Sequence, residues 1–364
     1  MYKTTALIIA FLCLNSQAAG ILKTIPWNGH SGAISFTFDD ACASQVTNVF
    51  PALQSRDIHA TFFIPGSWNF NQDPQPWIQA AQAGNEIANH TVSHLDLTIL
   101  DSTVIVDEIV KKADSLRALD PSINANTLAY PYCATNALVN KIADTQNIIA
   151  RTCGGSGQFS WTQKPSNWMQ MSSYIVTDAA TSAAALTSID QVASNNRWLV
   201  TLHHGISGDG SEVTTTQLNE LFDRAITNKL WIAPYRDIAA YWRASFTMDT
   251  VTATVIDGTW TLHWESPHPR MPAKIPLRIR IDNTILGSSV YVYQNQQSLT
   301  AESDGSYIID FMALNLKLSS SPIASEPVLE IAPETTRFHY NHPLTSSHFD
   351  LAGRKINSND SKRK

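Results

Sequence analysis

Between about residues 33 and 244, short apolar runs alternate with longer segments in which apolar positions recur every three or four residues. The runs have the length of buried strands, and the longer segments have the period of amphipathic helices. The predicted strands span residues 33–38, 60–64 and 86–89, with others near Leu128, Ile149, Met171 and Leu199. The predicted helices span residues 44–54, 77–83 and 102–119. Such regular alternation is typical of a parallel sheet, and the number of repeats favours a (β/α) barrel.

The pattern changes after about residue 245, where helical periodicity gives way to short alternating stretches and turn pairs such as Asp257-Gly258. The strands expected here span residues 252–255, 260–264, 277–281, 290–293 and 307–311. They predict an all-β, sandwich-like accessory domain over about residues 248–332. Trp260, Leu262 and Trp264 share one strand face, which favours a core stripe over a sugar-binding platform.

Both ends of the chain carry segments of another kind. An apolar run at residues 6–14, after Lys3 and before small residues up to Ala18, predicts a signal peptide over residues 1–18. The run is shorter than the ~20 apolar residues of a membrane span, so we expect a secreted or periplasmic protein without one. Residues 333–364 predict a flexible tail, and residues 348–356 (HFDLAGRKI) are similar to a C-terminal element of some proteins exported by the type IX route. Such an element would attach the protein to the cell surface.

Composition narrows the class of protein. With 43% hydrophobic residues, 15% charged residues and a net charge of -6, the chain is typical of a soluble globular protein, and we expect a monomer. The negative charge argues against a nucleic-acid partner. After signal cleavage, three cysteines remain for one disulfide in an oxidising compartment. Cys133 and Cys153 each end a short apolar stretch, which favours their pairing; a bridge to Cys42, or three buried thiols, are the alternatives.

Candidate metal ligands follow two of the predicted strands. His90 and His94 are four residues apart and project to one side of a helical turn, while Asp39 and Asp40 follow the first strand. Two imidazoles and one carboxylate commonly hold zinc and leave a position for water, and a second carboxylate can take that water's proton. Alone, the histidine pair is weak evidence, and the aspartate pair could cap a helix. In a barrel, however, the ends of parallel strands meet at one edge, where active sites lie.

Four motifs, in order, resemble those of the polysaccharide deacetylase family, also called the NodB homology domain or carbohydrate esterase family 4. They are Thr37-Phe38-Asp39-Asp40, His90-Thr91-Val92-Ser93-His94, Ala129-Tyr130-Pro131-Tyr132 and residues 198–206 (WLVTLHHGI). The resemblance covers about residues 30–243 and places the catalytic domain at residues 19–247. It implies a distorted, seven-stranded (β/α) barrel and a metal-dependent hydrolase. The implied substrate is an acetylated carbohydrate, most often an N-acetylglucosamine polymer of the chitin or peptidoglycan type.

The resemblance also implies residue roles. Asp39 would be the general base. The implied metal is zinc or cobalt, and its ligands would be Asp40, His90 and His94. The backbone N–H of Tyr132, after the rigid Pro131, would stabilise the oxyanion. A histidine would protonate the leaving group, and the position within the last motif favours His204 over His203.

One position departs from the pattern. Many family members have an arginine where this chain has Ala129, and Arg151 after the next predicted strand is a candidate to supply the missing cation. A salt bridge unrelated to the site is the alternative for Arg151. Two other functions stay open: an acetylxylan esterase with the same site, and a catalytically idle carbohydrate-binding protein, which the loss of the arginine motivates.

Overall fold

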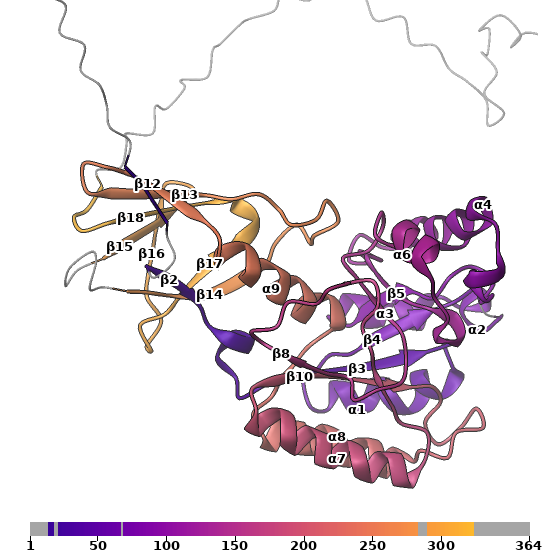
Figure 1. Ribbon diagram of the computed structural model, residues 1–364. Helices are drawn as coiled ribbons and strands as arrows, with labels where there is room; N and C mark the ends of the chain where they lie inside the picture. The colour runs from indigo at the N-terminus through magenta and orange to yellow at the C-terminus, as the bar shows by residue number, and fades with distance from the viewer. Residues whose placement is uncertain (1–13, 18–20, 67, 283–289, 324–364) are drawn as a thin grey trace, which may run out of the picture. The chain divides into compact units, whose positions relative to one another are not determined.

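The computed structural model describes residues 14–17, 21–66, 68–282 and 290–323. Its central element is a nine-stranded sheet in the order β7-β6-β5-β4-β3-β10-β8, with β11 paired to β3 and β9 paired to β10. The strands are β3 (Ala33–Asp39), β4 (Thr61–Ile64), β5 (Glu86–Asn89), β6 (Thr127–Ala129), β7 (Ile149–Arg151), β8 (Gln158–Ser160), β9 (Tyr174–Ile175), β10 (Arg197–His203) and β11 (Trp231–Ile232). All pairs are parallel except β10 with β8. The sheet curls into the predicted distorted (β/α) barrel (Figure 1).

β3 lies at the centre of this sheet and is buried along its whole length. Because side chains alternate across a strand, its two faces differ. Phe36 and Phe38 pack on the helical side, where Phe38 stacks on Phe62 at 5.2 Å. Thr37 and Asp39 point to the other face, and Asp39 is the last residue of the strand.

Helices cover the outer face of the sheet. They are α1 (Phe50–Gln54), α2 (Trp68–Gln72), α3 (Gln75–Gln82), α4 (Ser102–Val106), α5 (Lys112–Arg117), α6 (Ala137–Ala143), α7 (Ala179–Ser194) and α8 (Thr215–Thr227). The last helix, α9 (Tyr235–Met248), instead packs in a core that β3 and β10 share with the accessory strands β2 (Leu22–Thr24) and β14 (Pro276–Ile281). α7 and α8 lie side by side (Figure 1), and each begins with a capping box. Two predicted helices contain a π-helical turn: η2 (Gln45–Val49) opens the first, and η4 (Asp107–Lys111) joins α4 to α5. Such turns are frequent at functional sites.

The last strands form the predicted all-β part, in two sheets ordered β1-β12-β13-β18-β15-β16 and β17-β14-β2. They are β12 (Thr252–Ile256), β13 (Thr259–His263), β14 (Pro276–Ile281), β15 (Tyr291–Gln294), β16 (Gln297–Leu299), β17 (Tyr307–Asp310) and β18 (Asn315–Ser319). Leu262 and Trp264 are buried here, as expected of a core stripe. Two strands come from the N-terminus instead, β1 (Leu14–Gln17) and β2 (Leu22–Thr24). β2 precedes the barrel in the chain but pairs with β14 of the accessory part. The boundary between the catalytic and accessory domains at residue 247 stays a prediction.

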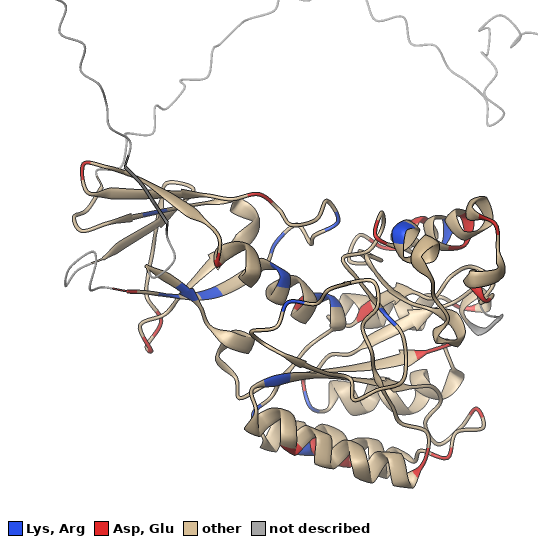
Figure 2. Cartoon of the chain, viewed as in Figure 1, with Lys and Arg blue, Asp and Glu red and all other residues tan. Residues whose placement is uncertain are grey.

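The predicted terminal segments are only partly described. β1 lies inside the predicted signal peptide and pairs with β12, whereas residues 1–13, 18 and the predicted tail lie outside the described residues. Among the described helices, none has the length and apolar character needed to cross a bilayer. Lysines, arginines and carboxylates are scattered over the described chain (Figure 2).

Candidate active site

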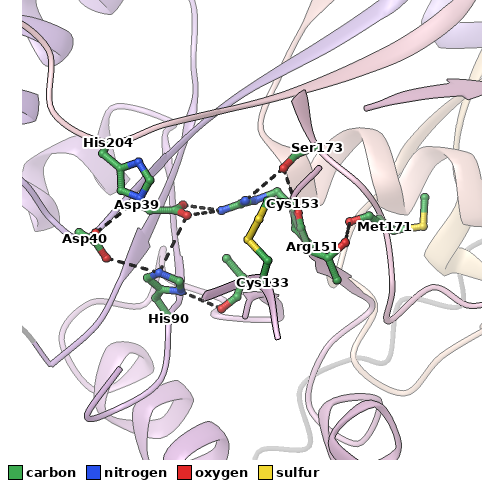
Figure 3. The surroundings of a disulfide bond; sticks show 11 residues. Asp39, Asp40, His90, Cys133, Arg151, Cys153, Met171, Ser173 and His204 are labelled. Carbon is green, nitrogen blue, oxygen red and sulfur yellow. Dashed lines mark hydrogen bonds and ion pairs between the residues drawn. A yellow bond between two sulfur atoms is a disulfide. The ribbon is translucent and has the colours of Figure 1, made fainter. Parts of the chain in front are cut away.

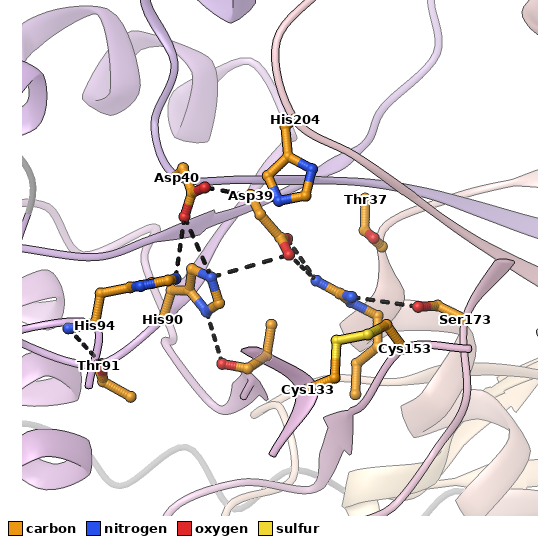
Figure 4. A network of polar contacts seen from close by, with 12 residues as sticks. Thr37, Asp39, Asp40, His90, Thr91, His94, Cys133, Cys153, Ser173 and His204 are labelled. Atoms are coloured by element: carbon orange, nitrogen blue, oxygen red, sulfur yellow. Dashed lines mark hydrogen bonds and ion pairs between the residues drawn. A yellow bond between two sulfur atoms is a disulfide. The ribbon is translucent and has the colours of Figure 1, made fainter. Parts of the chain in front are cut away.

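The predicted site residues meet at the C-terminal edge of the barrel sheet (Figure 4). Asp39 ends β3, His90 follows β5, Arg151 ends β7 and His204 follows β10. These strands run parallel, so their ends lie at the same edge. The fold thus gathers residues that are more than a hundred positions apart.

Three side chains form a cluster suited to a metal ion. Asp40 Oδ1 lies 3.5 Å from Nε2 of His90 and 3.3 Å from Nε2 of His94, and one donor atom from each residue lies within 4.8 Å of the others. A tetrahedral zinc ion with bonds of ~2.1 Å holds its ligand atoms about 3.4 Å apart. His90 Nδ1 lies 2.7 Å from the carbonyl oxygen of Ala129, the type of contact that orients metal-binding imidazoles. The donor set and its spacing fit a divalent cation.

The pKa shifts of Asp40 and His94 agree with metal binding. Burial raises the pKa of Asp40, but the contact with His90 and the charges of the three nearby imidazoles outweigh it and lower that pKa overall. Burial lowers the pKa of His94, and neighbouring His90 lowers it further. An ionised carboxylate and a neutral imidazole are the forms that bind metals.

Backbone conformation explains how adjacent carboxylates reach one pocket. Asp40 has a φ of 74°, which turns the chain directly after β3, so that its side chain lies near that of Asp39. Thr91, His94 and Tyr132 also have positive φ values, of 67°, 52° and 54°. Residues other than glycine rarely adopt this left-handed region, and such strain concentrates at functional sites. No pattern in the sequence indicated these conformations.

The loop that carries His94 is held from two sides. Glu108, buried in the π-helical turn η4, accepts a hydrogen bond from the Ser93 N–H through Oε2 at 2.7 Å, and its carbonyl accepts one from the Val92 N–H at 3.2 Å. On the other side, the Gly66 N–H donates to the Val92 carbonyl at 3.0 Å. A Cβ atom at Gly66 would lie 2.1 Å from that carbonyl oxygen. Sequence analysis missed Glu108, because helical periodicity does not reveal a π-helical turn.

Asp39 is paired with a buried arginine. Arg151 Nη2 donates to both carboxylate oxygens of Asp39, at 2.5 and 2.6 Å, and both side chains are almost fully buried. Nη1 of Arg151 also contacts Ser173 Oγ at 3.3 Å, and the guanidinium lies 4.9 Å from the ring centre of Phe63. Arg151 is in register with Ala129 on the neighbouring strand. A cation thus stands one strand away from the position where the resembled family carries its arginine.

A disulfide joins the two loops beside this pair (Figure 3). Cys133 and Cys153 are bridged with a Cα–Cα distance of 5.2 Å, which confirms the favoured pairing. Cys133 follows Tyr132, and Cys153 is two residues after Arg151, so the bridge ties the loop after β6 to the loop after β7. Cys42 is a free thiol, and burial raises its pKa to about 12.

The two neighbouring histidines differ sharply. His203 is buried, stacks on Phe38 at 5.0 Å and places Nε2 3.1 Å from Thr201 Oγ1. Burial lowers the pKa of His203 to about 3, so the ring is neutral. The side chain of His204 is 48% exposed, and its Nε2 lies 3.6 Å from Asp40 Oδ2. Only His204 faces the cluster.

Tyr132 lies on the open side of the cluster. Its side chain is exposed, and the ring packs edge-on against His94 at 4.9 Å. Its backbone N–H makes no hydrogen bond to another described residue. Pro131, which precedes it, is buried. The N–H is therefore free to donate to a group bound beside the cluster.

A cavity of about 430 Å³ extends from His204 along the loop after β10. Asp178, Asp209 and Glu212 line it together with backbone of that loop. Asp209 is already engaged, since its Oδ2 accepts a hydrogen bond from the Ser44 N–H at 2.7 Å. His204 therefore borders an open cavity on this side of the site.

Comparison with known proteins points to one family. Residues 28–148 match the family model described as polysaccharide deacetylase. This part of the chain is similar to the polysaccharide deacetylase family. The match includes the candidate ligands, Asp39 and Tyr132, whereas Arg151 and His204 lie beyond it.

Individual relatives of this deacetylase domain are distant. A chitooligosaccharide deacetylase from Rhizobium leguminosarum bv. trifolii is 28% identical over 206 residues, which cover 55% of this chain and 84% of that protein. A chitin deacetylase from Pestalotiopsis sp. is 30% identical over 106 residues, 29% of this chain and 35% of that protein. The solved structure of the Bc1960 peptidoglycan N-acetylglucosamine deacetylase has 20% identity and a TM-score of 0.43, and the alignment covers 59% of this chain and 91% of that one.

Proposed function

We propose that the protein is an exported, metal-dependent deacetylase that hydrolyses N-acetyl groups of N-acetylglucosamine oligomers or polymers. The coarser class, a carbohydrate deacetylase acting on carbon–nitrogen bonds, follows from the family. One observation carries the proposal: the cluster of Asp40, His90 and His94 stands beside an Asp39 that a buried arginine holds in place. The relatives named as chitooligosaccharide and chitin deacetylases support the choice of substrate.

The chain's own residues would hold the ion and handle the protons. Asp40, His90 and His94 would bind zinc or cobalt, and a bound divalent ion supplies an acidified water and a positive charge near the acetyl carbonyl. Asp39 Oδ2 lies 3.9 Å from His90 Nε2, so this carboxylate flanks the cluster and is placed to take the proton of the attacking water. Arg151 fixes the orientation of that carboxylate through two hydrogen bonds to its oxygens.

Two further groups would complete the reaction. The free backbone N–H of Tyr132 would donate to the oxyanion that develops on the carbonyl. His204, on the opposite side of Asp40, would give a proton to the leaving amine. His203 is a buried neighbour with a low pKa and has no place in proton transfer.

The Asp39–Arg151 contact supports an enzyme over an idle carbohydrate-binding protein. The hypothesis of an idle protein was based on the absence of an arginine at position 129. Arg151 on β7 is in register with Ala129 and contacts Asp39, so it can take the role of that arginine. An acetylxylan esterase with the same site remains the second candidate, because ester and amide hydrolysis pass through the same type of tetrahedral intermediate. Export is supported by the signal-peptide pattern and by the disulfide, which persists in oxidising compartments.

A substrate screen tests the proposal. Acetate release is measured with zinc-loaded protein on N-acetylglucosamine hexamer, peptidoglycan and acetylated xylan, with Asp39→Asn as the inactive control. We expect the highest kcat/KM on the hexamer. Preferred release from acetylated xylan would replace the proposal by the esterase, and binding without acetate release from any substrate would favour the idle protein.

A further inference from the structure

Lys112 is a buried lysine that the proposed reaction does not use. It opens α5, directly after the π-helical turn η4, and is only 3% exposed. Burial lowers the pKa of Lys112 to about 8, and no ion pair with a described carboxylate offsets that shift. A buried cation without a counter-charge costs stability, so packing alone would favour an apolar side chain at this position.

The ammonium group of Lys112 reaches the segment that follows β4. Its Nζ donates a hydrogen bond to the Pro65 carbonyl oxygen at 3.1 Å and lies 4.4 Å from the ring centre of Phe70. Pro65 comes directly after β4, and Phe70 belongs to α2. The face of an aromatic ring attracts a cation, so both contacts favour a lysine over an apolar residue. Lys112 thus connects α5 to the loop at the C-terminal edge of β4.

The same segment is hydrogen-bonded to the loop of the metal ligands. The His90 N–H donates to the Ile64 carbonyl at 3.3 Å, and the Gly66 N–H donates to the Val92 carbonyl at 3.0 Å. Pro65 lies between these two contacts and is buried, and its carbonyl accepts the hydrogen bond of the lysine. Without that donor, a buried carbonyl would lose its partner at the point where the two loops meet.

The junction between the two loops has little freedom to shift. A Cβ atom at Gly66 would lie 2.1 Å from the Val92 carbonyl oxygen, so the two backbones are in direct contact. Val92 is two residues before His94, whose left-handed φ of 52° leaves few alternative conformations. A displacement of Gly66 would therefore be passed on to His94 and change its distance from Asp40, which is 3.3 Å between Nε2 and Oδ1.

We propose that Lys112 is a positioning residue for the metal site, which fixes the segment after β4 so that this segment holds the loop of His94. Glu108, four residues earlier, accepts a hydrogen bond from the Ser93 N–H of the same loop. The loop would thus be held from two sides by side chains of η4 and α5. The identity of the ion rests on the proposed function, but zinc affinity can be measured without turnover.

Zinc affinity, read from competition with a chelating dye, tests the inference. Lys112→Met keeps the length of the side chain but removes the donor and the charge, so it should weaken zinc binding about three- to tenfold. Lys112→Gln keeps a polar group on a shorter side chain, and it should give the same loss even if Lys112→Met does not fold. Lys111→Met is the matched control, because Lys111 is the neighbouring lysine and its exposed side chain pairs with Asp107 at 2.6 Å. The control should leave zinc affinity unchanged.

A double-mutant cycle tests the route from Lys112 to His94. Gly66→Ala pushes the loop after β4 away from the Val92 carbonyl and should weaken zinc binding at least as much as Lys112→Met. If both changes act through the same junction, Lys112→Met should add little to the loss in the Gly66→Ala background. An equal loss from Lys112→Met in both backgrounds would overturn the proposed route.

Acetate release gives a second readout. On N-acetylglucosamine hexamer, Lys112→Met should be slower than the wild type at limiting zinc, and saturating zinc should restore most of the rate. Wild-type zinc affinity in folded Lys112→Met or Lys112→Gln protein, even with a lower free energy of unfolding, would overturn the inference. Zinc binding that depends on Lys112, without acetate release from any substrate by the intact protein, would refute the proposed function and leave the positioning role standing.

Discussion

Two halves of the candidate active site differ in how tightly the sequence constrains them. The metal cluster of Asp40, His90 and His94 comes from family motifs at fixed spacing, and it is partly open to solvent. The Asp39–Arg151 pair is almost fully buried and joins residues 112 positions apart. Coordination fixes the position of each ligand, whereas a supporting cation needs only to reach the carboxylate. The chain therefore keeps the ligand motifs, but the cation beside Asp39 is Arg151 on β7. The register-matched position on β6, where the resembled family has an arginine, is Ala129.

The largest effect on activity should come from changing Asp39, whose carboxylate lies between the metal cluster and Arg151. Asp39→Asn keeps the shape of the side chain but cannot take a proton, so kcat should fall about a thousandfold. Zinc content per chain, measured on the purified protein, should stay at the wild-type level. A loss below tenfold would assign the base to another group.

Removing the cation should have the next largest effect on activity. Arg151→Ala leaves Asp39 buried without a partner, which should cost about 3–5 kcal/mol of stability and lower kcat about a hundredfold. Denaturant unfolding and acetate release from N-acetylglucosamine hexamer check these outcomes.

Placing an arginine on β6 tests whether the cation beside Asp39 can come from either strand. The double variant Ala129→Arg with Arg151→Ala offers a cation from the register-matched position. We expect it to recover part of the activity lost in Arg151→Ala. An Arg151→Ala protein that is less stable but keeps wild-type turnover would show that the buried pair serves folding alone.

A smaller effect should follow from loosening the support of a metal ligand. Glu108→Ala removes the acceptor for the Ser93 N–H and should weaken zinc binding about tenfold. Glu108→Gln keeps an acceptor oxygen and is the matched control. Zinc affinity is read from competition with a chelating dye, and equal affinity in both variants would exclude a role of Glu108 in positioning His94.

The smallest effect on turnover should come from the disulfide. Cys133→Ser together with Cys153→Ser should lower the free energy of unfolding by about 3 kcal/mol, because the bridge closes a loop with a sequence separation of 20. Activity below the unfolding transition should fall only a few-fold. Cys42→Ser, which breaks no bridge, should change neither quantity.

The sequence predicted the barrel and the gathering of Asp39, Asp40, His90 and His94 at one edge, because strand periodicity and parallel pairing decide which residues share an edge. It also suggested that Arg151 could replace the cation missing at Ala129. It did not predict β1 and β2, since their few residues precede the barrel and find partners only in the accessory sheets.

Local backbone geometry was also out of reach. The π-helical turn that places Glu108 and the left-handed conformations at the site depend on tertiary packing. Neither leaves a periodic pattern or a glycine in the sequence.

The central claim is that Asp40, His90 and His94 hold the ion that the reaction needs. The most direct measurement is a zinc titration of chelator-stripped protein, with acetate release from N-acetylglucosamine hexamer recorded at each addition. The account predicts no release without metal, a rise that saturates at one zinc per chain, and greatly weakened zinc binding in His94→Ala. Full activity of the metal-free protein, or unchanged zinc binding in His94→Ala, would contradict it.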